Sequence, residues 1–354
     1  MHTAGIKHSI NIPNPGRRIF LIFLSLTAIV SVLFVLDIFL GSVDIKPGEI
    51  INAFLSPSES YANAILFKFR FPKALTALIV GAGLSLSGLQ MQTIFRNPLA
   101  GPDVLGVTSG ASLGVAFVIL GFSFYISPET ITGYGNWLLV FAAMAGAGSV
   151  MILILIIASR IKDIMTILIL GIMLSSGISA IVILLQYFSS ESLLKSYVIW
   201  TMGSLGNLTS DQLKVLFISV GTGTILSLFS SKMLNALLLG ENYAGSVGLN
   251  VTLARFIIFS STSIIAGSIT AFCGPIGFIG IAVPHMARRL FRTSDHKMLI
   301  PCTLLIGSAV LLFSDLISQL PGSEKVLPLN AVTSLIGIPV VIWVILQNRK
   351  YSAI

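Results

Sequence analysis

Charged residues are scarce in this chain of 354 residues: Asp, Glu, Lys and Arg together make up 10% of the sequence. A soluble globular domain carries about 25% charged residues. Hydrophobic residues instead account for 55% of the chain, and many of them fall in runs of about 20 residues. The shortage of charge therefore excludes a soluble enzyme or binding module and indicates a protein that lies mostly within a membrane.

Cysteine is almost absent, since the chain has only Cys273 and Cys302. Both lie in or beside apolar runs, and no CxxC or Cys/His spacing typical of a metal site occurs. We expect two small buried residues here, with a disulfide between them as the alternative. We predict no metal site.

Catalytic and energy-converting motifs are also missing. The sequence has no GxxxxGK[ST] phosphate loop, no HExxH and no GxSxG, so we expect no catalytic residues. Ionisable residues inside apolar runs are few, namely Asp37, His285 and Asp315. An ion-coupled carrier usually buries several such groups along its pathway, so this scarcity favours energy supplied from outside the membrane. An ion-coupled carrier and an intramembrane enzyme are the alternatives from other classes.

The net charge of +8 does not indicate a nucleic-acid partner, because the basic residues are scattered over short loops and not clustered beside aromatics.

Long apolar runs are what the sequence does contain. The first follows Arg17 and Arg18, and it is too long for a signal peptide and has no cleavage pattern. We predict an all-α polytopic membrane protein with about ten transmembrane helices, the eighth short and interrupted by Pro284. The expected spans are 19–40, 74–94, 104–124, 137–158, 164–187, 213–231, 253–273, 277–291, 299–319 and 328–347.

The distribution of positive charge predicts the orientation. With both termini in the cytoplasm, fourteen of the 21 Lys and Arg residues fall on the inner side. Lys68, Arg70 and Lys73 break this rule because they lie just outside the second span. Their side chains either reach lipid headgroups or dock an acidic patch on an external partner.

Glycines mark two places where close packing or a turn is expected. Gly81, Gly83 and Gly88 lie in the second span, where small residues permit close contact between helices. The loop at 230–255 is divided by Gly240 and Gly248 into pieces too short to span, so we expect two short helices at the cytoplasmic surface.

Two embedded ionisable residues have structural roles in our interpretation. His285 follows Pro284 and is expected to hydrogen-bond a carbonyl freed by the proline, with a proton relay as the alternative. Asp315 is expected to cap a helix or pair with a partner near the outer face.

A series of short motifs runs in order along nearly the whole chain. Together they are highly specific, although each alone is weak. By these motifs the chain resembles the permease subunits of bacterial ABC importers for iron–siderophores, haem and vitamin B12, the type II importers. The motif residues are Arg70, Phe71, Pro72, Lys73, Gly81, Ala82, Ser87, Gly88, Gln92, Arg96, Asn97, Pro98, Leu99, Ala100, Pro102, Leu105, Gly106, Gly110, Ala111, Trp200, Met202, Gly203, Ser204, Leu205, Leu239, Gly240, Glu241, Ala244, Gly248, Leu249, Gly274, Pro275, Ile276, Gly277, Phe278, Ile279, Gly280, Pro284, His285, Ala287, Arg288, Asp295, His296, Lys297, Pro301, Leu327, Pro328, Thr333, Ile336, Gly337 and Pro339.

The resemblance implies a location and a set of partners. It implies a single permease domain over 1–354 in the bacterial inner membrane, with a cytoplasmic tail at 1–18 and a cytoplasmic coupling loop at 230–255. Two permeases would form the pathway, as a homodimer or as a heterodimer with a paralogous permease. Two cytoplasmic ATPase subunits would bind ATP and magnesium, this chain would hold no cofactor, and a periplasmic binding protein would deliver the substrate.

The resemblance also implies roles for particular residues. ATPase coupling falls to Leu239, Gly240, Glu241, Ala244 and Gly248, with an ordinary helix-terminus charge as the alternative for Glu241. The cytoplasmic gate falls to Asn97, Pro98 and Leu99. Docking of the binding protein falls to Arg70, Lys73 and Lys325.

The chain departs from the family pattern at three of its residues. Lys73 and Gln319 stand where an arginine is usual, and Lys325 is the substitute we expect for Gln319. Asn330 stands where glycine is usual, and the sequence offers no reason for it.

We predict import of a ferric siderophore or similar metal-chelate by alternating access. The same machine carrying cobalamin or haem is the alternative.

Overall fold

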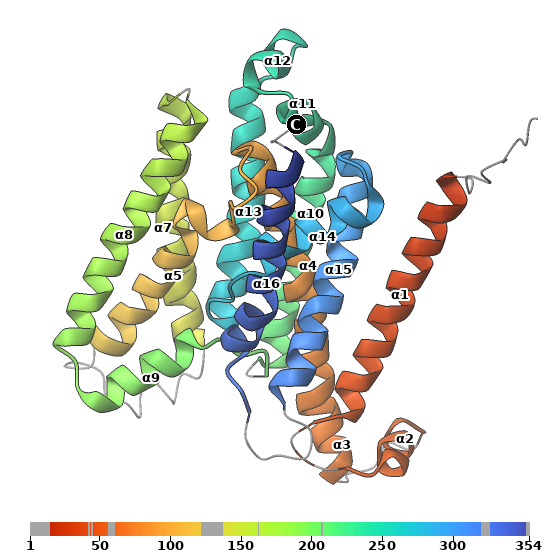
Figure 1. Cartoon of the computed structure of the whole chain (residues 1–354). Coiled ribbons are helices and arrows are strands. Elements are labelled where there is room, and N and C mark those ends of the chain that lie inside the picture. The colour runs from red at the N-terminus through yellow and green to blue at the C-terminus, as the bar shows by residue number, and fades with distance from the viewer. Residues whose placement is uncertain are drawn as a thin grey trace, which may run out of the picture.

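The structure is a computed structural model that describes residues 15–41, 43, 45–55, 61–121, 137–161, 163–206, 208–319 and 326–351. Within these ranges every regular element is helical (Figure 1). The long helices are α1 (Pro15–Phe39), α4 (Phe71–Ile94), α7 (Trp137–Arg160), α8 (Ile164–Tyr187), α10 (Ser210–Phe229), α13 (Val251–Cys273), α15 (His296–Ser318) and α16 (Leu329–Tyr351). The shorter ones are α2 (Pro47–Leu55), α3 (Tyr61–Ile65), η1 (Leu66–Arg70), η2 (Pro102–Leu105), α5 (Val107–Ala116), η3 (Phe117–Gly121), α9 (Glu191–Thr201), α11 (Ser231–Leu238), α12 (Glu241–Ser246) and α14 (Ile279–Phe291).

Each segment expected to cross the membrane contains a helix, which confirms the all-α polytopic class. By length and composition, seven helices of the described part can cross a membrane, and two shorter apolar helices cover Val107–Gly121 and Leu329–Trp343. The eighth predicted span is α14, which has 13 residues with Pro284 inside it. The exact number of crossings, the side on which each terminus lies and the domain bounds stay predictions; residues 1–14 lie outside the described part.

Two helices form the centre of the molecule, and one long helix lies at its edge. In the most apolar window of the stretch ending in α4, and in that of α13, 78% of residues are buried, against 11% in α1. α4 packs against α10, α13, α14 and α15, while α5, α7 and α8 form a neighbouring group that joins through α13 (Figure 1). Most of the surface of α1 is therefore not covered by other helices of this chain, and we expect lipid to contact it.

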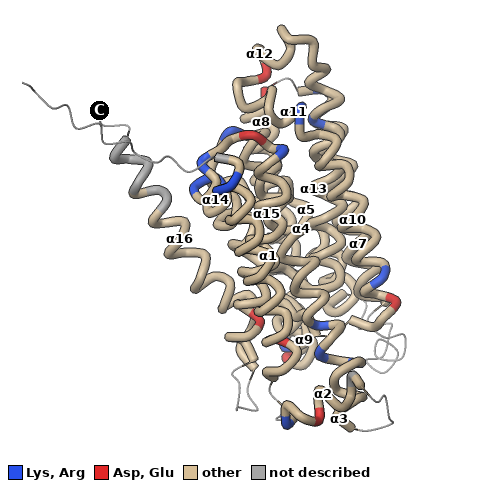
Figure 2. The backbone as a smooth tube through the Cα atoms, turned by 90° about the vertical axis from the view of Figure 1, so that its right-hand side faces the viewer, with Lys and Arg blue, Asp and Glu red and all other residues tan. Residues whose placement is uncertain are grey.

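The two ends of the bundle differ. α11 and α12 lie at one end, together with the start of α1 and the end of α16, and α2, α3 and α9 lie at the other (Figure 1). Lys and Arg gather around α14 at the first end (Figure 2). α11 and α12 are the two short helices predicted for the loop at 230–255.

Glycines allow the central helices to touch backbone to backbone. A Cβ on Gly81 would overlap the carbonyl of Gly307 in α15, and one on Gly88 would overlap Gly280 in α14. Such close contact requires a residue without a Cβ on the helix that approaches the carbonyl, as the sequence predicted for this segment.

Two details add to the sequence prediction. The helical stretch that contains α4 begins at Tyr61, well before the predicted span, and passes through the π-helical η1. Cys273 and Cys302 are both free and buried, as expected for small core residues.

Candidate functional site

The coupling loop folds into a compact projection whose turns are made by glycine. Gly240, before α12, and Gly248, after it, have φ of 105° and 88°, values that favour residues without a Cβ. Ala244 faces inward with no exposed surface. Leu239, Tyr243 and Val247 are 65%, 49% and 58% exposed, so apolar side chains cover the outside of this projection. An exposed apolar group at the tip of a projection is typical of a surface that a partner covers.

One arginine fixes the base of the projection. Arg255 in α13 is 4% exposed. Its Nε and Nη2 donate to the two carboxylate oxygens of Glu241 at 2.8 and 2.5 Å, and its Nη1 donates to the carbonyl of Ile161 at 2.8 Å. Glu241 does lie in the first turn of α12, but its carboxylate also holds α12 to α13, and Arg255 in turn bonds the carbonyl of Ile161 just after α7.

A buried histidine attaches α11 to the centre of the bundle. His296 has no exposed surface. Its Nε2 lies 2.8 Å from Thr93 Oγ1 in α4, and its Nδ1 lies 2.7 Å from Asn235 Oδ1 in α11. Asn235 Oδ1 has no proton, so Nδ1 carries the proton and donates. A rigid chain of contacts therefore runs from α11 through α15 to the last turn of α4.

Asp295 extends this chain to the solvent. Asn235 Nδ2 donates to Asp295 Oδ1 at 2.7 Å, and the amide of Lys297 donates to the same oxygen at 3.0 Å. These two hydrogen bonds, led by that from Asn235, hold the pKa of the Asp295 carboxyl below its usual value.

The predicted gate residues form a tight turn directly after α4. The amide of Leu99 donates to Asn97 Oδ1 at 2.9 Å, and Pro98 and Leu99 are exposed. His285 Nε2 donates to the carbonyl of Pro98 at 2.7 Å. His285 thus bonds a carbonyl as expected, but this carbonyl belongs to the gate turn and was not freed by Pro284.

Glutamines in α4 tie this helix to its neighbours near the gate. Gln92 accepts from Arg288 Nη1 at 2.5 Å and donates to the carbonyl of Ile281 at 3.0 Å, both in α14. Gln90 bonds the hydroxyl groups of Ser261 and Thr262 in α13. Sequence reasoning assigned no role to Gln90, Gln92, Arg288 or Asn235. Their signal is polarity within or beside apolar runs, where an unpaired polar group would be costly.

The basic residues predicted to lie on the outer side have partners within the chain. Arg70 is 7% exposed, and its guanidinium donates to the carbonyls of Ile38 and Phe39 at 3.0 and 2.9 Å and to that of Val43. Lys73 Nζ lies 3.0 Å from Asp315 Oδ2. Asp315 therefore pairs as expected. Docking by Arg70 and Lys73 stays a prediction, and Lys325 lies outside the described residues.

Both further departures from the family pattern have a structural explanation. Gln319 Nε2 donates at 2.8 Å to Asp37 in α1 and at 2.8 Å to Asp315, so it links two buried carboxylates. Asn330 Oδ1 accepts from the amide of Gly277 at 3.0 Å, which fixes the bend before α14.

The predicted site residues therefore form two groups. The coupling and gate residues lie together: a Cβ on Gly240 would contact the guanidinium of Arg96, which precedes the gate turn. Arg70 and Lys73 lie at the start of α4, the end of the helix opposite to the gate turn. Within the described ranges, no group of three or more His, Cys, Asp or Glu side chains is placed to hold a metal ion.

Comparison with known proteins places this arrangement in a family. The sequence profile of the FecCD transport family matches residues 29–347. The vitamin B12 import system permease protein BtuC of Klebsiella pneumoniae is 34% identical over 325 residues, which cover 92% of this chain and 93% of that protein. The BtuC protein of Salmonella typhi is 34% identical over 328 residues, with coverage of 92% and 95%.

Solved structures agree with the sequence matches. A protein described as a metal-chelate type ABC transporter, in an inward-facing conformation, has 31% identity and a TM-score of 0.78 over 91% of this chain and 98% of that one. PsaBC from Streptococcus pneumoniae, solved with a Fab, shares the fold with 15% identity and a TM-score of 0.52 over 84% and 94% of the two chains. The proteins of this family are multi-pass permeases of the inner membrane and not catalytic enzymes. By these matches this chain belongs to the FecCD transport family of type II ABC importer permeases.

Proposed function

We propose that this chain is the membrane pathway of an ATP-driven importer that brings a metal-chelate into the cytoplasm by alternating access. The observation that carries the proposal is the rigid attachment of the coupling projection. Arg255 fixes α12 to α13, and His296 links α11 to α4, the helix that leads into the gate turn. A force applied to α11 and α12 therefore reaches the gate without bending the projection.

The energy source in this proposal lies in the partners. Two ATPase subunits bind ATP and magnesium and seat the exposed residues Leu239, Tyr243 and Val247. This chain contributes no covalent chemistry. Two copies form the pathway, and a heterodimer with a paralogous permease is the alternative that co-purification distinguishes.

The gate in this proposal is the turn at Asn97, Pro98 and Leu99. Its backbone is held by His285 in α14, while α14 is held to α4 by Gln92 and Arg288. Relative motion of α4 and α14 would therefore move the turn.

The outer end of the proposed pathway receives the binding protein at Arg70, Lys73 and Lys325. Lys73 is 22% exposed beside Asp315, so an acidic group on the partner would share or replace that ion pair.

Two cargo candidates follow from different observations. The likeness to the metal-chelate transporter structure favours a metal-chelate such as a ferric siderophore. The BtuC relatives favour cobalamin. Both are bulky metal-chelates, which is the class we propose.

Reconstitution tests this proposal. The permease, an ATPase and a binding protein encoded beside it are placed in proteoliposomes, and uptake of cobalamin is compared with that of ferric siderophores. We expect uptake of one class only, and only with ATP. Uptake into vesicles that contain this chain alone, driven by an ion gradient, would contradict the proposal in favour of a secondary carrier.

A further inference from the structure

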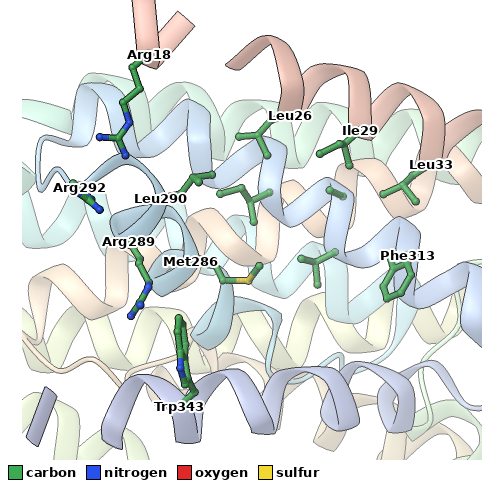
Figure 3. Close-up of a pocket in the computed structure, with 13 residues that line it drawn as sticks. Arg18, Leu26, Ile29, Leu33, Met286, Arg289, Leu290, Arg292, Phe313 and Trp343 are labelled. Atoms are coloured by element: carbon green, nitrogen blue, oxygen red, sulfur yellow. The ribbon is translucent and has the colours of Figure 1, made fainter. Parts of the chain in front are cut away.

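A large groove opens on the side of the bundle where α1 lies, away from the coupling and gate residues. It has a volume of about 1390 Å³ and is bounded by α1, α14, α15 and α16 (Figure 3). None of its described lining residues takes part in the contacts that fix α11, α12 or the gate turn. The groove is therefore a separate feature that requires its own explanation.

One end of the groove is strongly basic. Arg18 from α1, Arg289 from α14 and Arg292 after α14 line it and gather at the same end (Figure 3). Among the described residues that line the groove, none is acidic. The arginines lie at the bundle end where the Lys and Arg residues cluster, which the charge distribution predicts to be cytoplasmic (Figure 2).

The rest of the groove is apolar. Leu26, Ile29 and Leu33 on α1 face Phe313 on α15 (Figure 3). Ile29 and Phe313 remain 47% and 48% exposed. From Leu26 to Leu33 the helix rises on the order of 10 Å at 1.5 Å per residue. The apolar wall therefore fits within the depth of one leaflet of hydrocarbon, which is about half of a core of about 30 Å.

A stacking contact holds the basic end in place. The guanidinium carbon of Arg289 lies 4.0 Å from the centre of the Trp343 ring in α16. Arg292 has φ of 52°, a left-handed conformation that ends α14 and turns the chain toward α15. The backbone and a ring contact thus place two of the three guanidinium groups at the groove.

We propose that this groove binds an anionic phospholipid. Its phosphate lies among the three arginines, because arginine pairs with phosphate through two parallel hydrogen bonds. One acyl chain lies along the apolar side chains of α1 and α15. A basic pocket between transmembrane helices on the cytoplasmic side is a recognised form of anionic lipid site.

The charge of the groove argues against a second copy of this chain as the occupant. A two-fold contact through it would bring like charges together, because no described residue of its lining is acidic. A lipid phosphate brings negative charge to this basic end instead.

Lipid binding to the full-length chain tests the proposal. The protein is purified in neutral detergent, mixed with dioleoyl phosphatidylglycerol or dioleoyl phosphatidylcholine, and bound lipid is counted by native mass spectrometry. We expect retention of phosphatidylglycerol in preference to phosphatidylcholine. The Arg18→Gln/Arg292→Gln variant should lose on the order of tenfold or more in apparent affinity, since each arginine near a membrane surface contributes appreciably.

Matched variants keep the test decisive. Arg17→Gln/Arg160→Gln removes two exposed positive charges outside the groove and should retain phosphatidylglycerol. Ile29→Trp should fill the space along the apolar wall and displace the lipid, whereas Val32→Trp, on the exposed part of α1 outside the groove, should not.

Equal retention by all variants, or equal retention of the two lipids, would overturn the proposal. A disulfide between two copies carrying Ile29→Cys would also overturn it. The readout is lipid retention, so it does not depend on the cargo or on the ATPase.

Discussion

Arg255 shows how a charge can be kept inside a membrane protein. Its guanidinium is 4% exposed, yet Glu241 and the carbonyl of Ile161 accept three of its hydrogen bonds. Burying an ion pair is costly in itself, so its value lies more in fixing geometry than in overall stability.

Removal of the Glu241 carboxylate should show how much the folded state depends on this ion pair. Glu241→Ala leaves Arg255 buried without its counter-charge, and we expect a loss of about 3 kcal/mol in the free energy of unfolding. Thermal unfolding in detergent measures the loss. The Glu241→Ala/Arg255→Met variant should recover much of it because the charge is then gone too; a simple sum of the two single losses would contradict the pairing.

Asp295 gives the attachment of α11 a pH dependence. Its pKa is lowered in the folded protein, so its stabilising contribution is present above about pH 4, the unfolded value, and is lost as pH falls below it. We expect the unfolding temperature of the wild type to drop between pH 5 and pH 3 by more than that of Asp295→Asn. Parallel curves for the two proteins would show that the carboxylate does not matter.

At the scale of the helix, the packing of α4 depends on close contact between its backbone and that of α14 and α15. Gly88→Ala would place a methyl group on the carbonyl of Gly280, and overpacking of this kind costs about 1–3 kcal/mol. Gly148→Ala in α7, where a Cβ meets nothing within 4 Å, is the matched control and should be neutral or slightly stabilising. The measurement is the unfolding temperature of both variants; equal temperatures would refute the close contact.

The helices themselves could largely be predicted from the sequence, because apolar runs of the right length have few other solutions in a lipid environment. The pair α11 and α12 was also predictable, since Gly240 and Gly248 limit helix length. The shortness of α14 was predicted as well, but the predicted interruption at Pro284 was wrong, because the helix continues through this residue from Ile279 to Phe291. The contacts between elements were not. Nothing local to Arg70 indicates that its partners are carbonyls at the end of α1, and nothing near His296 indicates Asn235 and Thr93. Such pairs join residues far apart in the chain, so only the packed structure brings them together.

At the scale of the whole molecule, His285 connects the gate turn to α14. His285→Ala removes one hydrogen bond to the carbonyl of Pro98, and a bond of about 1 kcal/mol would shift the balance between closed and open turns roughly fivefold. We expect a folded protein whose ATPase activity in the assembled transporter depends less on the presence of cargo. His285→Gln, which can still donate, should recover part of the control. Unchanged coupling in His285→Ala would assign the histidine to structure alone.

The outer basic residues allow a second test on the assembled transporter. Lys73→Gln should weaken binding of the periplasmic protein severalfold at low salt and less at high salt, because exposed charges are screened. Lys46→Gln, which removes an exposed lysine just before α2 at the same end of the bundle, is the control. Binding that is equal in both variants and independent of salt would remove Lys73 from the docking surface.

The ion pair between Lys73 and Asp315 has a consequence for how the chain is made. Lys73 enters the membrane with α4, but Asp315 is synthesised only much later, with α15. Until then the lysine lacks this partner on the side that we predict to be the outer one, where the charge rule disfavours it, and Asp37 in α1 is the acidic group already present near it. Arg70 faces no such delay, because the carbonyls of α1 that receive it are already in place. We therefore expect nascent chains truncated before α15 to show a mixture of α4 orientations, and Arg70 to be the residue that keeps most of them correct.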